Sequence, residues 1–336
     1  MLQTLLSKQF EIQADEEIII GRYEACKRNN QLYMLVPIHQ YEEDDLNELE
    51  RFATHLVQKG DRDIVQFLHT KDGKRETEWE KRKYCILFNN QIRNQEKDRS
   101  GRMLGKFHHR GRSINFTVTR SSRVGQWKQL WEKRLDQMEK VWSTMIYQQP
   151  ENEFDRMFIE SFSYYLGLAE NSIQYLIDTE IDDDPLPMDS GTICHNRFSS
   201  SAWGESFIIK NPFDWVFDHS SRDLAEWIRD RYFQNMQTYH RDMAKLLTDY
   251  QTITPLSSFS WRLLYARMVF PLHYFENIEN YYSTSSEQQK NYLEDKLEKY
   301  LHQSSEYERF LRDFFQHAEV PIRKMKIPEL EWLKRS

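Results

Sequence analysis

The sequence of 336 residues contains few of the residues that mark disulfide-rich or disordered chains. Its three cysteines, Cys26, Cys85 and Cys194, form no C-x-x-C pair, so neither a disulfide framework nor a zinc ribbon is indicated. Glycine and proline occur only 10 and 9 times, whereas aromatic residues make up 14%. This composition is typical of a folded chain in a reducing compartment.

Long apolar runs are also missing, since no segment approaches about 18 uninterrupted apolar residues. The first residues, MLQTLLSKQF, lack a basic segment followed by a long apolar run. We therefore expect no membrane partner, and synthesis in the cytoplasm without Sec export. The net charge of −7, with both signs interspersed, gives no electrostatic reason to expect a nucleic-acid partner.

Residues 1–90 are predicted to form a small lobe that combines an antiparallel sheet with one helix. Three strand candidates come first, FEIQADEEIII, GRYEACK and QLYMLVPI. A helix follows, for which Asp45 is the expected N-cap, Glu48 its capping-box partner and Gly60 the terminator. Two further strand candidates, IVQFLHT and KYCILFN, complete the lobe.

Residues 91–336 are predicted to form a larger helical lobe, which makes the fold class α+β with two lobes. The amphipathic pattern predicts helices over 96–110, 122–147, 152–180, 222–248, 257–282, 286–302 and 304–317. One interval, 191–216, differs. Its two short apolar runs, Gly191–Cys194 and Ser206–Ile209, are spaced as a hairpin.

Other charged motifs carry less information. His108 and His109 are adjacent on a predicted helix and point about 100° apart, with no neighbouring cysteine or carboxylate cluster in sequence. No metal site is therefore predicted. The basic stretches 81–83 and 120–123 are candidates for phosphate binding, but in an acidic protein a solvated surface is the favoured interpretation.

The interval 191–216 carries a more specific pattern. Ile193-Cys194-His195-Asn196-Arg197 resembles the hydrophobic-x-H-x-D loop of the small-molecule kinases related to aminoglycoside phosphotransferases. Phe213-Asp214-Trp215 resembles their metal-binding segment, and residues 218–226, DHSSRDLAE, resemble the later D-P-x-x-D-L-A motif.

Two upstream motifs extend the resemblance over nearly the whole chain. Residues 101–109, GRMLGKFHH, look like the L-A-x-F-H helix of that family, and Glu153-Phe154-Asp155 falls where spore-coat members have an F-D pair. The chain thus resembles the kinase-like spore-coat proteins of endospore-forming bacteria, the CotS and YutH type, and most closely the YutH type. The resemblance implies a protein kinase-like fold, a location in the spore coat and other coat proteins as partners.

Against this family pattern, three of the residues that phosphoryl transfer needs are missing. Such transfer uses an aspartate as base, an asparagine and an aspartate as metal ligands, and a third-strand lysine that steadies the phosphates. The pattern places Arg197 at the base, and a guanidinium stays protonated and accepts no proton. It places Ala202 at the metal-binding asparagine, and the third strand contains no lysine.

Asp214 matches the retained metal-type aspartate, and a solvated or capping aspartate is its alternative. His195 is expected to hold its loop through a backbone hydrogen bond, since the sequence shows no acidic partner for it. Asp223 is expected to cap a helix that begins at Leu224. Arg197 can also fill the vacated site by pairing with Asp214.

Three functions follow from these residues. The favoured one is a catalytically degenerate kinase-like protein with a structural or interaction role in spore coat assembly, without a cofactor. The alternative is an active ATP- and magnesium-dependent phosphotransferase with relocated catalytic groups, in which Asp214 or Asp218 holds the metal and a lysine from elsewhere in the chain contacts the phosphates. The third is a module that binds a nucleotide or small ligand without chemistry.

Overall fold

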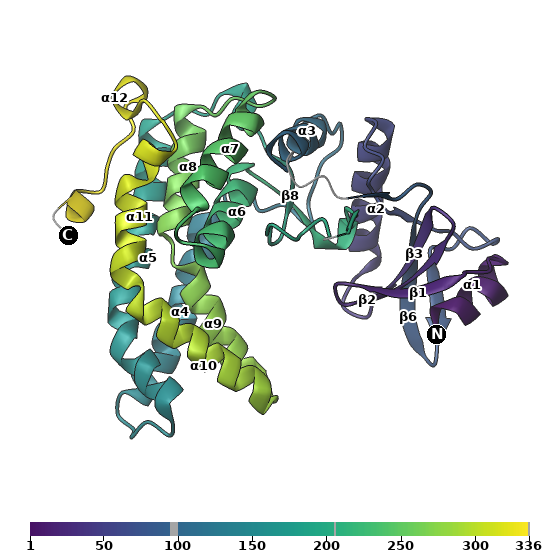
Figure 1. Cartoon of the computed structure of the whole chain (residues 1–336), viewed down its shortest axis with the longest axis horizontal. Helices are drawn as coiled ribbons and strands as arrows, with labels where there is room; N and C mark the ends of the chain where they lie inside the picture. Colours follow the sequence, from purple (N-terminus) through teal and green to yellow (C-terminus); the bar gives the residue numbers. More distant parts are fainter. Residues whose placement is uncertain (95–99, 205, 335–336) are drawn as a thin grey trace. The chain divides into compact units, whose positions relative to one another are not determined.

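The computed structural model describes residues 1–94, 100–204 and 206–334 (Figure 1). The chain forms two compact units, each built from separate stretches of sequence. The first unit contains 1–123, 190–223 and 245–255, and the second contains 124–189, 224–244 and 256–336. The predicted lobe boundary near residue 90 stays a prediction.

The first unit contains an antiparallel sheet with the strand order β1-β2-β3-β6-β4. Strand β5 pairs with residues 82–85 of β6. The strands are β1 Glu16–Ile20, β2 Tyr23–Arg28, β3 Gln31–Pro37, β4 Gln66–Phe67, β5 Glu76–Trp79 and β6 Arg82–Asn89. The predicted sheet is confirmed, although β5 was not predicted because its residues lie within a highly charged stretch.

A first helix, α1 (Leu2–Phe10), was also not predicted. Its Leu2, Leu5 and Leu6 are buried in the same apolar cluster as Tyr33 and Leu35 of the sheet. The predicted strand that began at Phe10 is therefore too long. The helix ends where Glu11 adopts a left-handed conformation, and β1 begins only at Glu16.

The helix after β3, α2, spans Glu43–Gln58 and begins earlier than predicted. Its N-cap is Glu42, whose backbone N–H donates to Asp45 Oδ2 at 2.9 Å. Asp45 is therefore the third residue of a capping box and not the cap itself. The shift leaves Glu48 available for a different interaction, described below.

The predicted hairpin between 191–194 and 206–209 is wrong. Strand β8 (Thr192–His195) pairs with β10 (Trp215–Asp218), whereas β9 (Phe207–Ile208) pairs with β7 (Arg93–Asn94). Short apolar runs indicate strands but do not identify their partners. Helix α3 (Ser100–Arg112) packs on β8, where a Cβ on Gly111 would lie 2.8 Å from the backbone nitrogen of Ile193.

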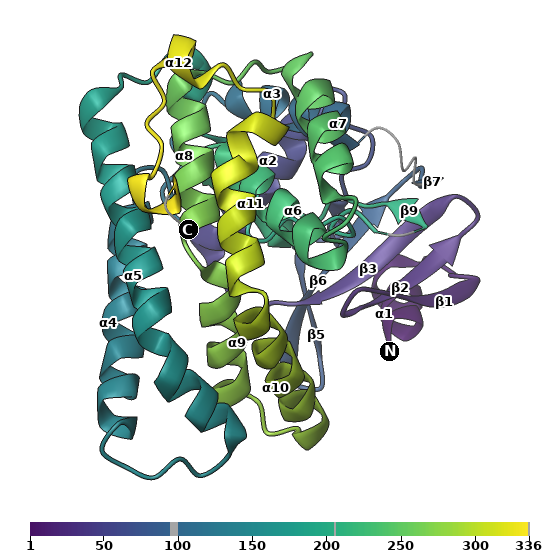
Figure 2. The same cartoon turned by 60° about the vertical axis from the view of Figure 1, so that its left-hand side comes forward.

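The second unit is helical, and α4 and α5 run alongside each other in it (Figure 2). Its helices are α4 Trp127–Met145, α5 Glu153–Asp182, α8 Ser258–Val269, α9 Leu272–Ser283, α10 Glu287–His302, α11 Ser304–His317 and α12 Ile322–Met325, with most of α6 Ser221–Gln234 and the first half of α7 Tyr239–Gln251.

Two of the predicted long helices are each divided in two. The predicted helix 222–248 forms α6 and α7, and the predicted helix 257–282 forms α8 and α9. The second break lies at Phe270, whose backbone is extended, and at Pro271, which lacks the N–H that a continuous helix needs. Apolar periodicity continues across both breaks, which explains why the pattern did not show them.

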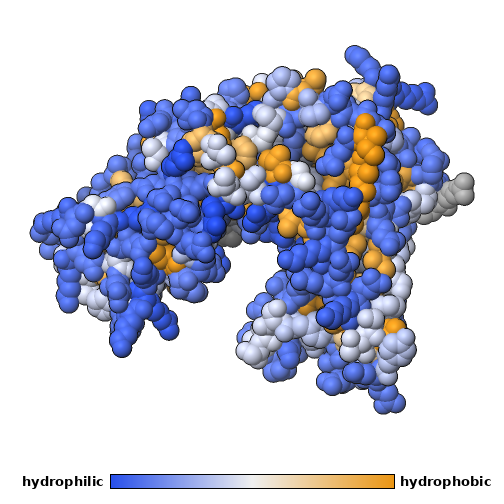
Figure 3. Space-filling view, turned by 180° about the vertical axis from the view of Figure 1, so that it is seen from behind, coloured by the Kyte–Doolittle hydropathy of each residue, from blue (hydrophilic) through white to orange (hydrophobic). Residues whose placement is uncertain are grey.

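Hydrophilic residues cover most of the face shown in Figure 3, with smaller hydrophobic patches among them. Of the helices in the described ranges, none is both long enough and apolar enough to cross a membrane.

Candidate functional site

The pairing of β8 with β10 brings two predicted site residues together. His195 lies opposite Trp215 in the ladder, and the N–H of Asn196 donates to the carbonyl of Asp214 at 2.7 Å. The loop that contains Arg197 therefore begins beside the backbone of Asp214.

His195 has the acidic partner that the sequence did not reveal. The Asp223 carboxylate accepts from the backbone N–H of His195 at 2.9 Å, and its Oδ2 lies 2.7 Å from His195 Nδ1 and 3.0 Å from His108 Nε2. All three side chains are buried. The prediction that Asp223 caps a helix from Leu224 is wrong, because α6 begins at Ser221 and the carboxylate faces the two histidines.

The environment of Asp223 favours its ionised form. Burial by itself would raise the pKa of this carboxyl, but the interaction with His195 and the hydrogen bond from His108 outweigh burial and hold the pKa far below its ordinary value. Burial also lowers the pKa of His108, against the opposing effect of Asp223. Asp223 is thus a buried anion that accepts hydrogen bonds from His195 and His108.

Trp203 determines the tautomer of His195. Its indole Nε1 lies 2.9 Å from His195 Nε2, and an indole N–H can only donate. Nε2 of His195 must therefore accept, which places the ring proton on Nδ1, facing Asp223. This hydrogen bond leaves no free proton-accepting nitrogen on His195 for a substrate.

A second residue that the sequence did not single out, Arg222, fixes the start of the loop. Its guanidinium donates to the carbonyl of His195 at 3.0 Å, to the carbonyl of Asn196 at 3.1 Å and to Asp218 Oδ2 at 2.8 Å. Asp218, which the alternative function would use as a metal ligand, is thereby buried in an ion pair with Arg222.

Arg197 and Ala202 lie in the loop that these contacts hold. Arg197 is exposed, and its Nη1 donates to the carbonyl of Asn196 at 2.8 Å. Ala202 is half-buried in a turn in which its N–H donates to the carbonyl of Ser199 at 3.2 Å. Neither side chain offers an oxygen to a metal ion or a base to a hydroxyl group.

Asp214 is the predicted site residue that carries a carboxylate. It is half-buried at the end of the short 3-10 turn Pro212–Asp214. Burial raises the pKa of its carboxyl, and the interaction with His195 and the charge of Arg22 partly oppose this rise. Arg22 follows Gly21 in the turn between β1 and β2, so this turn supplies a cation to the same site.

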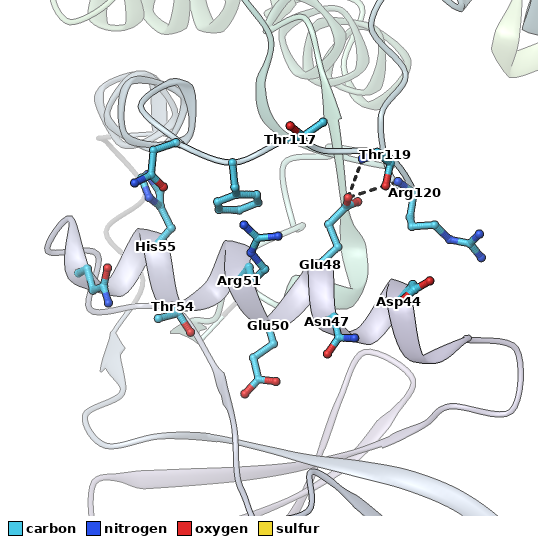
Figure 4. Close-up of a pocket in the computed structure, with 13 residues that line it drawn as sticks. Asp44, Asn47, Glu48, Glu50, Arg51, Thr54, His55, Thr117, Thr119 and Arg120 are labelled. Atoms are coloured by element: carbon cyan, nitrogen blue, oxygen red, sulfur yellow. Dashed lines mark hydrogen bonds between the residues drawn. The ribbon is translucent and has the colours of Figure 1, made fainter.

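Strand β3 contains no lysine, and a glutamate of the helix that follows it binds backbone amides (Figure 4). In kinases a glutamate of the helix after the third strand pairs with a third-strand lysine. Here Glu48 of α2 accepts from the backbone N–H groups of Thr119 at 2.7 Å and Ser121 at 2.7 Å, and from Arg120 at 3.2 Å. These bonds outweigh the effect of burial and lower the pKa of Glu48.

Lys210 is a buried lysine of the same unit, but its charge is already paired. Its Nζ lies 2.8 Å from Asp61 Oδ2 and 3.6 Å from Asp63 Oδ2. Arg110 also pairs with Asp61 at 3.0 Å, and Arg93 pairs with Asp63 at 2.6 Å. This network fixes Lys210 as a structural cation.

The described residues include one grouping of possible metal ligands, His108, Cys194 and Asp223, with ligand atoms within 4.8 Å of one another. Sequence reasoning missed it because the three residues are far apart in the chain. Both ring nitrogens of His108 are within hydrogen-bond distance of other groups, Nε2 of Asp223 and Nδ1 of Tyr250 at 2.9 Å. Burial raises the pKa of the Cys194 thiol well above its ordinary value. The grouping is therefore a hydrogen-bonded cluster and not a prepared metal site.

The family of the chain follows from comparison with known proteins. The family described as "Spore coat putative kinase YutH" matches residues 3–314. The chain belongs to this family. The endospore coat-associated protein YutH of Bacillus subtilis is 41% identical over 311 residues, which cover 93% of this chain and 91% of the relative. Spore coat protein S of the same organism is 23% identical over 175 residues, which cover 50% of this chain and 49% of the relative.

Solved structures confirm the predicted kinase-like fold. An aminoglycoside phosphotransferase from Alicyclobacillus acidocaldarius superposes with a TM-score of 0.66 at 13% identity, over 91% of this chain and 93% of that protein. A spectinomycin phosphotransferase in complex with ADP and spectinomycin gives a TM-score of 0.60 at 13% identity, over 89% and 93%. At this identity the likeness concerns the fold alone.

Proposed function

We propose that this YutH-family protein is a catalytically degenerate kinase-like protein with a structural or interaction role in spore coat assembly. The observation that carries the proposal is Arg197 at the position of the catalytic base. A guanidinium cannot accept the proton of an attacking hydroxyl at any physiological pH. The surrounding contacts from Arg222, Asp223 and Trp203 preserve the architecture of the loop without supplying another base.

The residues present do not fit a nucleotide with two magnesium ions. Asp214 offers one carboxylate, but Ala202 has no ligand atom, and Asp218 is paired with Arg222. The β3 strand contains no lysine, and Glu48 binds backbone amides. We therefore propose that the protein works without ATP, magnesium or another cofactor.

Membership in the family supports the location. The relatives bear the names endospore coat-associated protein and spore coat protein. We accordingly propose that this chain acts in the spore coat of an endospore-forming bacterium, after synthesis in the cytoplasm, with other coat proteins as its partners.

Isothermal titration of the purified protein with ATP, with and without magnesium, tests the proposal that the protein works without nucleotide. We expect no heat of binding up to millimolar nucleotide, with Asp214→Ala as a matched variant that gives the same result. Magnesium-dependent binding in the micromolar range that Asp214→Ala abolishes would overturn the proposal.

One observation favours the alternative, an active phosphotransferase with relocated groups: the carboxylate of Asp214 is retained beside the loop. Such an enzyme needs a cation to replace the β3 lysine, and Arg22 lies close enough to influence the Asp214 pKa. Magnesium-dependent ATP hydrolysis that is lost in both Asp214→Ala and Arg22→Gln would establish this alternative.

A further inference from the structure

Strand β1, with the sequence EEIII, forms one edge of the sheet in the first unit (Figure 2). Among the described residues its only strand partner is β2, which follows the two-residue turn Gly21-Arg22. Ile18 and Ile20 are half-buried, whereas Ile19 lies on the opposite face and is 79% exposed. Folded proteins usually protect sheet edges, because an open apolar edge pairs readily with another chain. The exposed isoleucine therefore indicates a surface for pairing.

The pairing with β2 determines which backbone groups of β1 face outward. A two-residue turn is closed by a hydrogen-bonded pair, which here is Ile20 and Tyr23. Hydrogen-bonded and non-hydrogen-bonded pairs alternate along an antiparallel ladder, so Glu17 and Ile19 occupy non-hydrogen-bonded positions. Their N–H and C=O groups point away from β2, and no described residue bonds to them. These groups are the donors and acceptors that an added strand needs.

A bulge limits the open edge at the start of β1. Asp15 donates its N–H to the carbonyl of Lys27 at 2.9 Å, although Glu16 is the residue opposite Lys27 in the ladder. Two residues thus oppose one, and the backbone N–H of Asp15 is turned toward β2. The edge that stays open runs from residue 17 to residue 19, a length that suits a short extended segment.

Most charged side chains beside the open edge already have partners. Glu16 pairs with Lys27 at 3.7 Å, and Glu24 of β2 lies 4.0 Å from the N-terminal amine. Arg22, in the turn, donates to the hydroxyl of Tyr23 at 2.8 Å. Each of these contacts is internal to the first unit and leaves no free cation at the edge.

Two acidic side chains beside the edge have no counter-charge. Asp15 and Glu17 are exposed and form no ion pair with any described residue. Glu17 lies two residues before Ile19, so the two side chains share one face of the strand. The open edge thus presents an apolar side chain next to an unpaired carboxylate. An aliphatic and a basic side chain of an added strand would complement them.

A second copy of β1 does not supply this cation. Residues 13–21, QADEEIIIG, contain no lysine or arginine. In every register that pairs two copies of β1, the residue opposite Glu17 therefore carries no positive charge, and in some registers it is acidic. Like charges opposite each other destabilise a strand pair. The charge pattern favours a segment of a different protein.

We propose that the open edge of β1 binds an extended segment of a partner protein as an additional antiparallel strand. In that direction the residue opposite Ile19 comes first, and the residue opposite Glu17 follows two positions later. The partner segment accordingly has the pattern aliphatic-x-Lys/Arg. Backbone pairing supplies the affinity, and the two side chains supply the register. Glu17 and Ile19 lie outside the loop that contains Arg197, so binding at this edge does not depend on the loss of catalysis.

Selection from a display library of short random peptides tests the charge pattern, with the full-length wild-type protein, Glu17→Lys and Glu78→Lys as parallel targets. Glu78, an exposed glutamate of β5 in the same sheet, is the matched control. We expect the wild-type protein and Glu78→Lys to enrich aliphatic-x-Lys/Arg, and Glu17→Lys to enrich aliphatic-x-Asp/Glu. A peptide enriched by the wild-type protein should bind Glu17→Lys about fivefold or more weakly, because an attractive cross-strand pair becomes repulsive.

A second pair of variants tests the backbone pairing. Ile19→Pro removes an N–H that faces outward and none that bonds to β2, so the sheet should persist while binding of the enriched peptide is abolished. Ile19→Thr keeps the N–H and a β-branched side chain and should retain binding. In the wild-type protein, the bound peptide should shift the backbone amide resonances of 17 and 19 most. The exchange of charge preference in Glu17→Lys provides a test that does not require the proline variant to fold.

Four outcomes would overturn the proposal. These are the absence of any enriched peptide, enrichment of the same peptides by the wild-type protein and Glu17→Lys, the largest amide shifts outside 16–20, and self-association of the wild-type protein that Ile19→Pro abolishes. The last outcome would assign the edge to a second copy of this chain.

Discussion

The indole N–H of Trp203 donates a hydrogen bond of 2.9 Å to Nε2 of His195. Trp203 directly follows Ala202, the residue that the motif resemblance places at the metal-binding asparagine. Its ring also lies close to those of Phe107, His195 and Phe198, and its side chain is buried. The loop is thus held by a tryptophan next to the position where the family pattern has a metal ligand.

This hydrogen bond predicts the tautomer of His195. In the wild-type protein we expect the proton on Nδ1, as judged from the ¹⁵N chemical shifts of the ring. Trp203→Phe leaves Nε2 buried without a donor and should lower the free energy of unfolding by about 1–3 kcal/mol, with a change in those shifts. Trp142→Phe is the matched control, because it removes an indole bond to the carbonyl of Ile159 and should leave His195 unchanged. An unaltered His195 spectrum in Trp203→Phe would contradict the assignment.

Replacing the buried anion should cost more than replacing an exposed one. Asp223→Asn removes the charge that two histidines and a backbone N–H share, and should lower the free energy of unfolding by about 3–5 kcal/mol in denaturant titrations. Asp249→Asn, which removes the partner of exposed Arg102, should cost less than about 1 kcal/mol. Equal costs for the two variants would show that Asp223 is not the organising anion of the site.

Stability should fall as the pH is lowered from 7 to 5. Burial lowers the pKa of His108 in the first unit and of His273 in the second, so the unfolded chain binds more protons than the folded one below its histidine pKa of about 6.5. The stability that each neutral histidine contributes is complete above that pH and is lost as the pH falls. Each group adds a slope of up to about 1.4 kcal/mol per pH unit.

Denaturant titrations of His108→Asn and His273→Asn at several pH values check this slope. Each variant should remove only its own part of the slope, since the two residues lie in different units. A wild-type stability that does not change between pH 7 and 5 would refute the prediction.

The sequence predicted the kinase-like fold, and solved structures confirm it. The order of the elements was predictable because local signals in the sequence mark most of them. The alternation of strands β1 to β3 and the turn residues between them were visible in sequence, as was the pattern of α10 and α11, predicted at 286–302 and 304–317 and observed at Glu287–His302 and Ser304–His317. Such elements need only near neighbours to define them.

The candidate site was less accessible to the same reasoning. The contact between His108 and Asp223 joins residues 115 positions apart, and that between Lys210 and Asp61 joins residues 149 positions apart. No periodicity connects such residues, so the sequence identified His195 without its acidic partner. Asp223 was predicted to be a helix N-cap, because an aspartate near the start of a helix usually caps it.

Glu48 should anchor the segment Thr119–Ser121 to helix α2. Glu48→Gln replaces an anion that accepts from three backbone N–H groups and should lower the free energy of unfolding by about 1–3 kcal/mol. Limited proteolysis should then cleave within 114–121 more rapidly than in the wild-type protein. Glu50→Gln on the same helix is the control, since Glu50 contacts Arg75 and His69 and not this segment. Equal cleavage in both variants would mean that Glu48 does not hold the segment.

Variants of Lys210 distinguish a structural cation from a relocated catalytic one. Lys210→Met leaves Asp61 buried with a single remaining cation, Arg110, and should lower the free energy of unfolding by about 3–5 kcal/mol. Adding Asp61→Asn to that variant should cost much less than the sum of the two single changes, because the second change removes the charge that the first left unpaired. A double-mutant cycle by denaturant titration measures this coupling. Two results together would instead assign the lysine to a nucleotide. These are additive effects of the two changes and a loss of nucleotide binding in Lys210→Met. A lysine engaged mainly with Asp61 cannot bind a phosphate group at the same time.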